Sequence, residues 1–126
     1  MPEEPLVAIV DDDQSIRRTT EDLLESAGFL AASFASADSF LRSKWLKRVC
    51  CMIADMRMPG MSGIELHQRL SASGRAIPTI LISAYLDERV RARALQAGVV
   101  CCLAKPFAPE ELLACVRAAL TRTPKS

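Results

Sequence analysis

The stretch LVAIVDDD, residues 6–13, places five apolar residues directly before three acids. A short, continuous apolar run is typical of a strand that is buried on both faces, as the strands of a parallel sheet are. Residues 14–27 then repeat at the helical period and are followed by Gly28, a natural helix stop. The apolar and small residues on one face of this helix are Ile16, Thr20, Leu23, Leu24 and Ala27. The stretch therefore predicts a buried strand that leads through acids into an amphipathic helix.

The same alternation continues along the chain. We expect further strands at residues 30–34, 49–54, 79–83 and 99–104. We expect further helices at residues 37–46, from Ile64 to Leu70, at 87–97 and from Pro109, whose ring suits the first helical turn. Strict alternation predicts an α/β fold with a single doubly wound, five-stranded parallel sheet and helices on both faces.

Length and composition limit the class of protein. The chain has 126 residues, half of them hydrophobic, which fits one globular domain with a real core. The net charge of +1 gives no general affinity for nucleic acid or an anionic membrane. No apolar run approaches the roughly 20 residues that span a bilayer. The acidic N-terminus does not resemble a signal peptide, so we expect a cytoplasmic location.

The five cysteines do not read as a disulfide framework or a zinc site. They are Cys50, Cys51, Cys101, Cys102 and Cys115. Their number is odd, four of them form adjacent pairs, and the spacing that zinc sites favour is absent. We expect buried structural thiols, and we rank a thiol-redox role well below that.

Polar residues gather at the carboxyl ends of the predicted strands. The first strand ends in Asp11 and Asp12, the third in Asp55, the fourth in Ser83 and the fifth in Lys105. These ends meet at one edge of a parallel sheet, where ligands of such folds bind. Each residue alone has a structural explanation, such as a cap or a solvated loop residue, and Asp13 is predicted to be a helix cap. Their conjunction predicts a functional site.

The chemistry of this edge favours a hard divalent cation. Clustered carboxylates repel one another unless a cation intervenes, and Lys105 alone cannot balance three acids. Oxygen ligands without histidines or thiols suit Mg²⁺ or Mn²⁺ together with phosphate oxygens. We therefore expect room for a phosphoryl group between the metal and the lysine.

Four segments carry a family resemblance: VDDD at 10–13, DMRMPGMSG at 55–63, SA at 83–84 and KPF at 105–107. Together they resemble the response-regulator receiver domain of two-component signalling, and in particular FixJ-like receivers. The resemblance covers about residues 5–121 as the receiver domain, with 1–4 as an N-terminal tail and 122–126 as a tail or the start of a linker. It implies a flavodoxin-like sheet with strand order 2-1-3-4-5, an order the fold class includes.

The resemblance also implies roles for individual residues. Asp55 would accept a phosphoryl group from a sensor histidine kinase. Asp12, Asp55 and the backbone carbonyl of Arg57 would bind the metal, and Asp11 would act through a metal-bound water. The phosphoryl group would be held by Ser83 and Lys105, the latter in a cis peptide bond with Pro106. The chain would be a signalling domain that promotes only its own phosphorylation and dephosphorylation, not an enzyme.

The sequence departs from the family pattern at Cys102. The family usually has an aromatic residue there, three positions before the lysine, whose movement reports phosphorylation. A small thiol cannot make that movement, so we expect switching through the segment after Ser83, including Tyr85. Arg57 and Tyr85 stand two residues beyond Asp55 and Ser83, where they either shield a phosphoryl group from water or simply pack at the surface.

The resemblance suggests partners, and two other functions stay open. A receiver dimer would use the face of the fourth helix, fifth strand and fifth helix. Arg89, Arg91 and Arg93 on this helix favour a solvated face, with a partner contact surface as the alternative. A DNA-binding domain would follow in a longer protein, whereas these residues contain no helix-turn-helix and predict no direct contact with nucleic acid or membrane. One alternative is a metal-dependent phosphohydrolase with an aspartyl-phosphate intermediate, although Arg57 stands where its general acid belongs. The other is an interaction module that works without phosphorylation.

Overall fold

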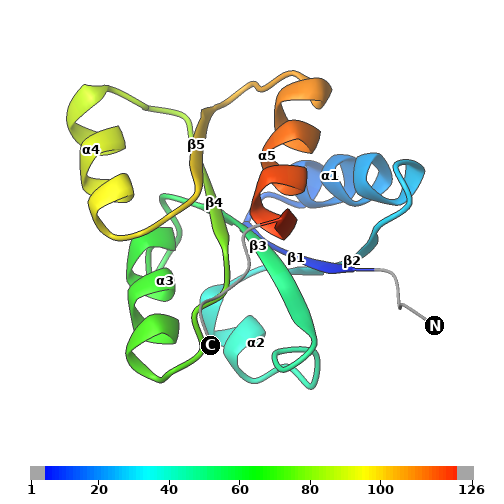
Figure 1. Cartoon of the computed structure of the whole chain (residues 1–126), viewed down its shortest axis with the longest axis horizontal. Helices are drawn as coiled ribbons and strands as arrows, with labels where there is room; N and C mark the ends of the chain where they lie inside the picture. Colours follow the sequence, from blue (N-terminus) through cyan, green and yellow to red (C-terminus); the bar gives the residue numbers. More distant parts are fainter. Residues whose placement is uncertain (1–4, 122–126) are drawn as a thin grey trace.

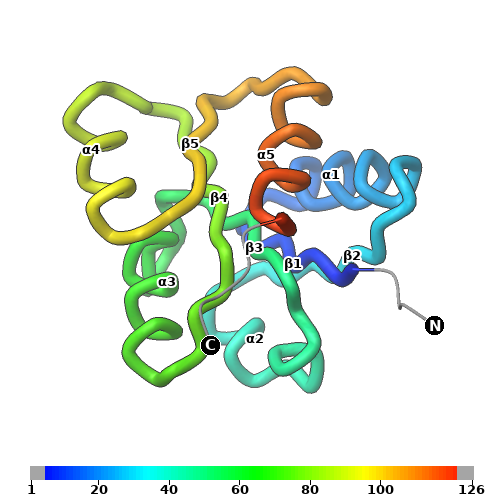
Figure 2. The backbone as a smooth tube through the Cα atoms, viewed as in Figure 1, coloured from blue at the N-terminus to red at the C-terminus, as the bar shows by residue number. Residues whose placement is uncertain are grey.

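The computed structural model describes residues 5–121 and has one parallel sheet at its centre (Figures 1 and 2). The strands are β1 (Leu6–Val10), β2 (Leu30–Phe34), β3 (Val49–Asp55), β4 (Thr79–Ser83) and β5 (Cys101–Ala104). Their order across the sheet is β2-β1-β3-β4-β5, and every neighbouring pair is parallel. The predicted fold class and strand order are confirmed.

Helices cover both faces of the sheet. They are α1 (Gln14–Ser26), α2 (Ala37–Leu41), α3 (Gly63–Ala72), α4 (Glu88–Gln96) and α5 (Pro109–Thr121). Leu24 of α1 and Leu112 of α5 belong to one hydrophobic cluster with Ile53 of β3. Phe40 of α2, Leu66 of α3 and Ala94 of α4 belong to a second cluster. Two helices therefore pack on one face and three on the other, as Figure 1 shows.

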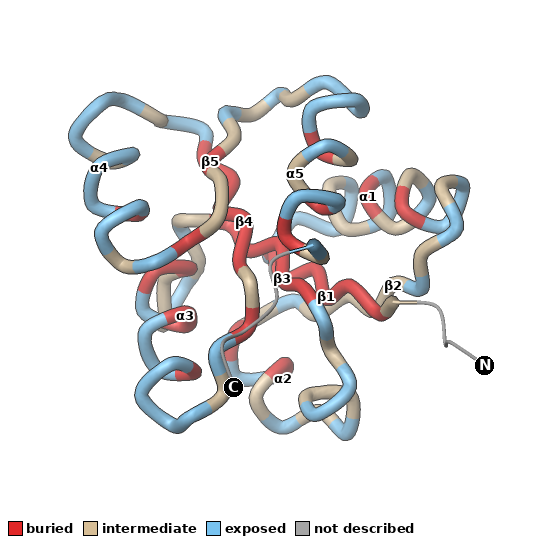
Figure 3. Tube along the Cα trace, viewed as in Figure 1, coloured by how far each residue is buried: buried red, intermediate tan, exposed pale blue. Residues whose placement is uncertain are grey.

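The central strands are the most deeply buried part of the chain (Figure 3). All five residues of β1 and of β4 are buried, and so are the last five of β3. Strands enclosed on both faces favour apolar residues at successive positions, which explains the continuous apolar runs in the sequence. The rigid central strands hold their carboxyl ends in fixed positions relative to one another.

The helix starts follow local capping chemistry. Asp13 caps α1, because its Oδ1 accepts hydrogen bonds from the backbone N–H groups of Ser15 (2.8 Å) and Ile16 (3.3 Å). Ser62 and Glu65 form a reciprocal capping box at the start of α3. The predicted capping role of Asp13 is confirmed, which separates it from the two acids before it.

Two predicted elements fall short by two or more residues at one end. The helix predicted at 37–46 ends at Leu41, because the Ser43 hydroxyl accepts the backbone N–H of Trp45 (2.9 Å) and redirects the chain into turns. The strand predicted at 99–104 begins only at Cys101. Val99 instead donates its N–H to the carbonyl of Ala94 (3.2 Å), which completes the end of α4.

The expectation of buried thiols holds only in part. Cys51 and Cys102 are buried, and Cys101 and Cys115 are half-buried. Burial raises the pKa of the Cys51 thiol to about 12, so this group is an inert apolar side chain at neutral pH. Cys50 is exposed, contrary to the prediction, because the buried part of β3 begins only at the next residue, Cys51.

Within residues 5–121, no helix is both long and apolar enough to cross a membrane.

Candidate functional site

Three carboxylates meet at the carboxyl ends of β1 and β3. One oxygen each from Asp11, Asp12 and Asp55 lies within 4.8 Å of the others. Asp11 is fully buried and Asp55 is 7% exposed, whereas Asp12 is open to solvent. The predicted convergence of these acids is therefore present, and one side of the cluster is accessible from outside.

Lys105 lies against the two buried carboxylates. Its Nζ is 3.1 Å from Oδ2 of Asp11 and 3.3 Å from Oδ2 of Asp55. Its backbone N–H donates to the carbonyl of Ser83 (2.9 Å), which ties the end of β5 to the end of β4. The Lys105–Pro106 peptide bond is cis, as expected from the resemblance. One ammonium thus contacts two of the three carboxylates, and the cluster keeps an excess of negative charge.

Backbone contacts hold the two buried acids in place. Oδ1 of Asp11 accepts the N–H of Asp13 (2.9 Å), and Oδ1 of Asp55 accepts the N–H of Arg57 (3.3 Å). Nη1 of Arg17 on α1 donates to the carbonyl of Asp11 (2.8 Å). In each acid the other oxygen, Oδ2, is the one that faces Lys105. The carboxylates are therefore oriented before any ligand arrives.

The electrostatics of the cluster follow from this geometry. Burial raises the pKa of Asp55, the charge of Asp11 raises it further, and Lys105 partly offsets both. Burial alone lowers the pKa of Lys105, but the Asp11 and Asp55 carboxylates outweigh it and raise the pKa. The lysine therefore stays charged at neutral pH. A further positive charge near Asp55 would stabilise the ionised form of this carboxylate.

The donor set fits a magnesium-type ion. Oδ2 of Asp11 is buried and accepts no hydrogen bond of good geometry from the described residues, although it is ion-paired with Lys105. Three carboxylates with an open side match the oxygen-rich, partly hydrated coordination that Mg²⁺ prefers. A hard divalent cation therefore suits this set of residues.

Ser83 lies at the end of β4, but its hydroxyl is engaged elsewhere. The Oγ donates to the carbonyl of Tyr85 (3.0 Å) and accepts the Tyr85 N–H (3.1 Å). Such a closed local loop is a stable serine turn. Ser83 thus lies at the predicted edge of the sheet, and its hydroxyl is hydrogen-bonded to the backbone of the segment between β4 and α4.

The three residues singled out for tuning have different surroundings. The guanidinium carbon of Arg57 lies 5.3 Å from the centre of the Tyr85 ring, within the range of a cation–π contact. Both residues are exposed, Tyr85 at 70%. Cys102 is buried in the α4-side cluster, and its carbonyl accepts a long bond from Nη1 of Arg91 (3.4 Å). Cys102 therefore lies inside the fold, away from the carboxylates.

Sequence reasoning missed two supporting residues. A Cβ added at Gly63 would lie 2.5 Å from the carbonyl oxygen of Asp55 and 2.8 Å from Leu81, so only glycine lets α3 start this close to the acceptor strand. Gly63 was visible only as part of a turn. The contact of Arg17 with the Asp11 carbonyl had no sequence signal, because an arginine on a half-buried helix position does not indicate which acceptor it reaches.

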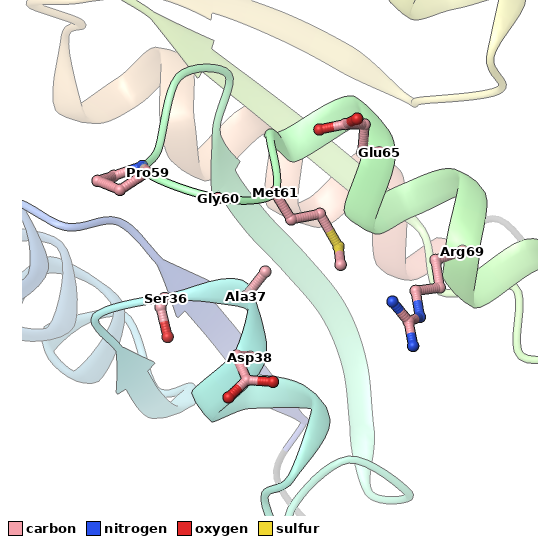
Figure 4. Close-up of a pocket in the computed structure, with 8 residues that line it drawn as sticks. All are labelled: Ser36, Ala37, Asp38, Pro59, Gly60, Met61, Glu65 and Arg69. Atoms are coloured by element: carbon pink, nitrogen blue, oxygen red, sulfur yellow. The ribbon is translucent and has the colours of Figure 1, made fainter.

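A hollow of about 530 Å³ lies apart from the acids, between α2 and α3 (Figure 4). The Met61 side chain points into it, with Asp38 and Arg69 at its margin. Its walls are the start of α2, the 59–61 turn and the exposed side of α3. No carboxylate of the acidic cluster lines it, so it does not belong to the candidate site.

An acidic, metal-compatible site with a facing lysine, at the carboxyl edge of a 2-1-3-4-5 sheet, defines the receiver class of signalling domains. The chain belongs to the response regulator receiver domain family, whose model matches residues 7–117.

Similar proteins agree with this assignment. The response regulator protein TmoT of Ectopseudomonas mendocina is 36% identical over 123 residues, which are 98% of this chain and 56% of TmoT. The transcriptional regulatory protein FixJ of Azorhizobium caulinodans is 36% identical over 98% of this chain and 58% of its own length. The chain thus spans about half the length of these curated relatives.

Solved structures show the same fold. The structure described as FixJ-N superposes with a TM-score of 0.86 at 29% identity, covering 99% of this chain and 100% of that one. The response regulator StyR superposes with a TM-score of 0.85 at 42% identity, covering 94% of this chain and 60% of that one.

Proposed function

We propose that this receiver accepts a phosphoryl group on Asp55 from a partner histidine kinase and changes conformation to control an output. The observation that carries the proposal is the placement of Lys105, whose ammonium lies 3.3 Å from Oδ2 of Asp55. The carboxylate of Asp55 has a raised pKa, one oxygen held by a backbone N–H and the other facing a cation, and it is therefore a nucleophile prepared for an anionic electrophile.

The transfer is written with Asp55 as the attacking group. An oxygen of its carboxylate forms a bond to phosphorus while the bond from phosphorus to the kinase histidine nitrogen breaks. The imidazole leaves with the electron pair, and the product is a mixed anhydride on Asp55. Phosphoryl transfer needs mainly positioning and charge neutralisation, and Lys105 supplies part of both.

A Mg²⁺ ion, or Mn²⁺ in its place, would supply the remaining positive charge. Asp12, Asp55 and the carbonyl of Arg57 would hold it directly, and Asp11 through a water. The buried Oδ2 of Asp11 and the clustered carboxylates support this assignment.

The conformational change would begin at Ser83. To donate to a phosphoryl oxygen, its hydroxyl must leave the Tyr85 carbonyl. Charge-assisted bonds from Ser83 and Lys105 would each contribute about 1.5–3 kcal/mol. Their sum approaches the ~5.5 kcal/mol that inverts a 1:99 equilibrium. The released segment 84–88 would then carry the signal to α4, since Cys102 is too small and too buried to act as a moving aromatic residue.

The partners follow from the class. The sensor histidine kinase is one. Another is a second receiver, bound on the face of α4, β5 and α5. A third is a DNA-binding output domain in a longer protein, which is supported by relatives that extend beyond the matched region. We place this module in the cytoplasm, and we assign it no turnover beyond its own phosphorylation and dephosphorylation.

The identity of residue 57 argues against the phosphohydrolase alternative. Such an enzyme needs an acid two residues after its nucleophile, whereas Arg57 stands there and its guanidinium lies over the Tyr85 ring. An interaction module that works without phosphorylation has no use for three clustered carboxylates. Burial and the neighbouring Asp11 charge raise the pKa of Asp55, which costs stability at neutral pH.

Incubation with a small acyl phosphodonor and Mg²⁺, followed by intact mass, tests the proposal. We expect one phosphoryl adduct on the wild type and none on Asp55→Asn, while Asp22→Asn, on the exposed side of α1, behaves as wild type. A missing adduct on the wild type, or an adduct that persists in Asp55→Asn, contradicts the proposal. Release of inorganic phosphate over many turnovers would favour the hydrolase.

A further inference from the structure

Asp12 differs from the other two acids of the cluster in how its carboxylate is held. In Asp11 and Asp55, Oδ1 accepts a backbone N–H and Oδ2 faces Lys105. Within residues 5–121, no hydrogen bond or ion pair restrains the Asp12 carboxylate, which is exposed to solvent. The place of this carboxylate in the cluster therefore depends on the backbone that carries it.

The peptide unit between Asp11 and Asp12 is anchored from α1. Nη1 of Arg17 donates a hydrogen bond to the Asp11 carbonyl, at 2.8 Å. Such a bond from a charged donor is roughly twice as strong as one between neutral groups. The Asp11 carbonyl and the Asp12 N–H belong to one planar peptide unit, so a bond that orients the first also orients the second. Arg17 therefore acts on the backbone at the point where Asp12 begins.

The contact follows from the way the chain passes from β1 into α1. Asp13 caps the helix, which begins at Gln14. Helical side chains lean toward the N-terminus of their helix, so the side chain of Arg17 returns over the first turn to the end of β1. Arg17 is half-buried there, whereas the next residue, Arg18, is exposed. Two adjacent arginines thus carry the same charge, and the hydrogen bond to the Asp11 carbonyl comes from the first of them.

We infer that Arg17 is a positioning residue for the cation site, because through the Asp11 carbonyl it fixes the backbone that carries Asp12 and keeps this carboxylate in the cluster. The inference rests on the proposed metal site and does not require phosphoryl transfer. Charge alone would act in the opposite direction. A guanidinium near carboxylates repels a divalent cation, so its removal would tighten metal binding, whereas loss of positioning weakens it. The sign of the change in affinity separates the two roles.

Titration with Mg²⁺ at constant ionic strength, followed by amide NMR, tests the inference. Arg17→Met removes the donor and keeps much of the side-chain bulk. It should raise the dissociation constant for Mg²⁺ about tenfold, the lower end of the range for residues that support a metal ligand. Arg17→Lys keeps a charged donor and should give an intermediate affinity. Arg18→Met removes an equal charge one residue away and should not weaken Mg²⁺ binding.

A second measurement distinguishes positioning from a purely structural role. In the metal-free chain, Arg17→Met should shift the amide resonance of Asp12, while urea unfolding checks that the fold is kept. Arg17→Lys carries the same test if Arg17→Met does not fold.

Equal or tighter Mg²⁺ binding in folded Arg17→Met would overturn the inference, and so would equal weakening in Arg18→Met. A wild type that binds no Mg²⁺ would overturn the proposed metal site together with this inference. A wild type that binds Mg²⁺ but gains no phosphoryl adduct would count against the proposed transfer alone.

Discussion

The guanidinium of Arg57 lies 5.3 Å from the centre of the Tyr85 ring, so the residues two positions beyond Asp55 and Ser83 are in contact beside the acidic site. Each is also tied to the site through its backbone, Arg57 to Oδ1 of Asp55 and Tyr85 to the Ser83 hydroxyl. The side-chain contact bridges two loops that come from different strands. If these residues shield a phosphoryl group on Asp55 from water, they therefore do so as a pair in contact, which the sequence did not predict.

The first prediction concerns the lifetime of the aspartyl phosphate. Arg57→Ala and Tyr85→Ala should each accelerate its loss, because either change opens the contact and admits water to the anhydride. Since the two residues act together, the double variant should be little faster than the faster single one. Decay of the labelled protein after donor removal measures this, with Arg89→Ala as the control for loss of an exposed arginine. If the phosphate decays at the wild-type rate in both single variants, Arg57 and Tyr85 only pack at the surface and do not shield the phosphoryl group.

The second prediction concerns Cys102. If the signal passes through segment 84–88, wild-type protein should respond to phosphorylation, and Cys102→Tyr should alter the size of the response without being required for it. Chemical-shift changes in α4 upon phosphorylation report the response directly. Should only the tyrosine variant respond, switching in the wild type through Ser83 and Tyr85 is excluded.

The third prediction concerns charge repulsion. In metal-free buffer Asp55→Asn should raise the free energy of unfolding by about 1 kcal/mol, because it removes a charge that burial and repulsion from Asp11 disfavour more than Lys105 stabilises it. Magnesium should stabilise the wild type more than this variant. Urea unfolding with and without Mg²⁺ tests both statements, and Asp22→Asn serves as the control. If Asp55→Asn were less stable than the wild type, the favourable contacts of Asp55, such as the ion pair with Lys105, would outweigh the repulsion between the acids.

The fourth prediction concerns Gly63. Gly63→Ala should cost about 1–3 kcal/mol of unfolding free energy, because the new methyl group meets the Asp55 carbonyl and Leu81. Phosphorylation should slow as well, since α3 can only relieve the conflict by moving the acceptor strand. Ala72→Gly, at the other end of α3, provides a control for helix propensity. If Gly63→Ala is destabilised but is phosphorylated at the wild-type rate, glycine at 63 matters for packing and not for the position of Asp55.

The fifth prediction concerns pH. His67 is buried, its Nδ1 lies 2.7 Å from Oγ1 of Thr79, and burial lowers its pKa. A lowered folded-state pKa means that, below about pH 6.5, the unfolded chain binds a proton that the folded chain does not. The free energy of unfolding should therefore fall as pH drops through that value, with no histidine contribution above it. Denaturation across pH 5–8 should show less of this decline in His67→Gln than in the wild type, because His67 is the sole histidine. Equal slopes would contradict the assignment.

The sequence alone determined the order of elements and the set of residues at the acidic edge. Continuous apolar runs such as Leu6–Val10 are required wherever a strand is enclosed on both faces, so the central strands could be read directly. Asp11, Asp12, Asp55 and Lys105 were found because parallel strands bring their carboxyl ends to one edge. The short α2 was not predicted, since a single hydroxyl at Ser43 ends the helix against a pattern that favoured continuing it.

Contacts between distant segments could be decided only by the tertiary structure. The commitment of Ser83 to the Tyr85 backbone, the stacking of Arg57 on Tyr85 and the need for glycine at 63 depend on distances of a few ångströms between separate loops. The bond from Arg17 to the Asp11 carbonyl likewise depends on how α1 starts against the end of β1. A residue pattern specifies which face a side chain occupies, because that follows from the period of the backbone. It does not specify which neighbour the chain brings there, because many packings share the same period.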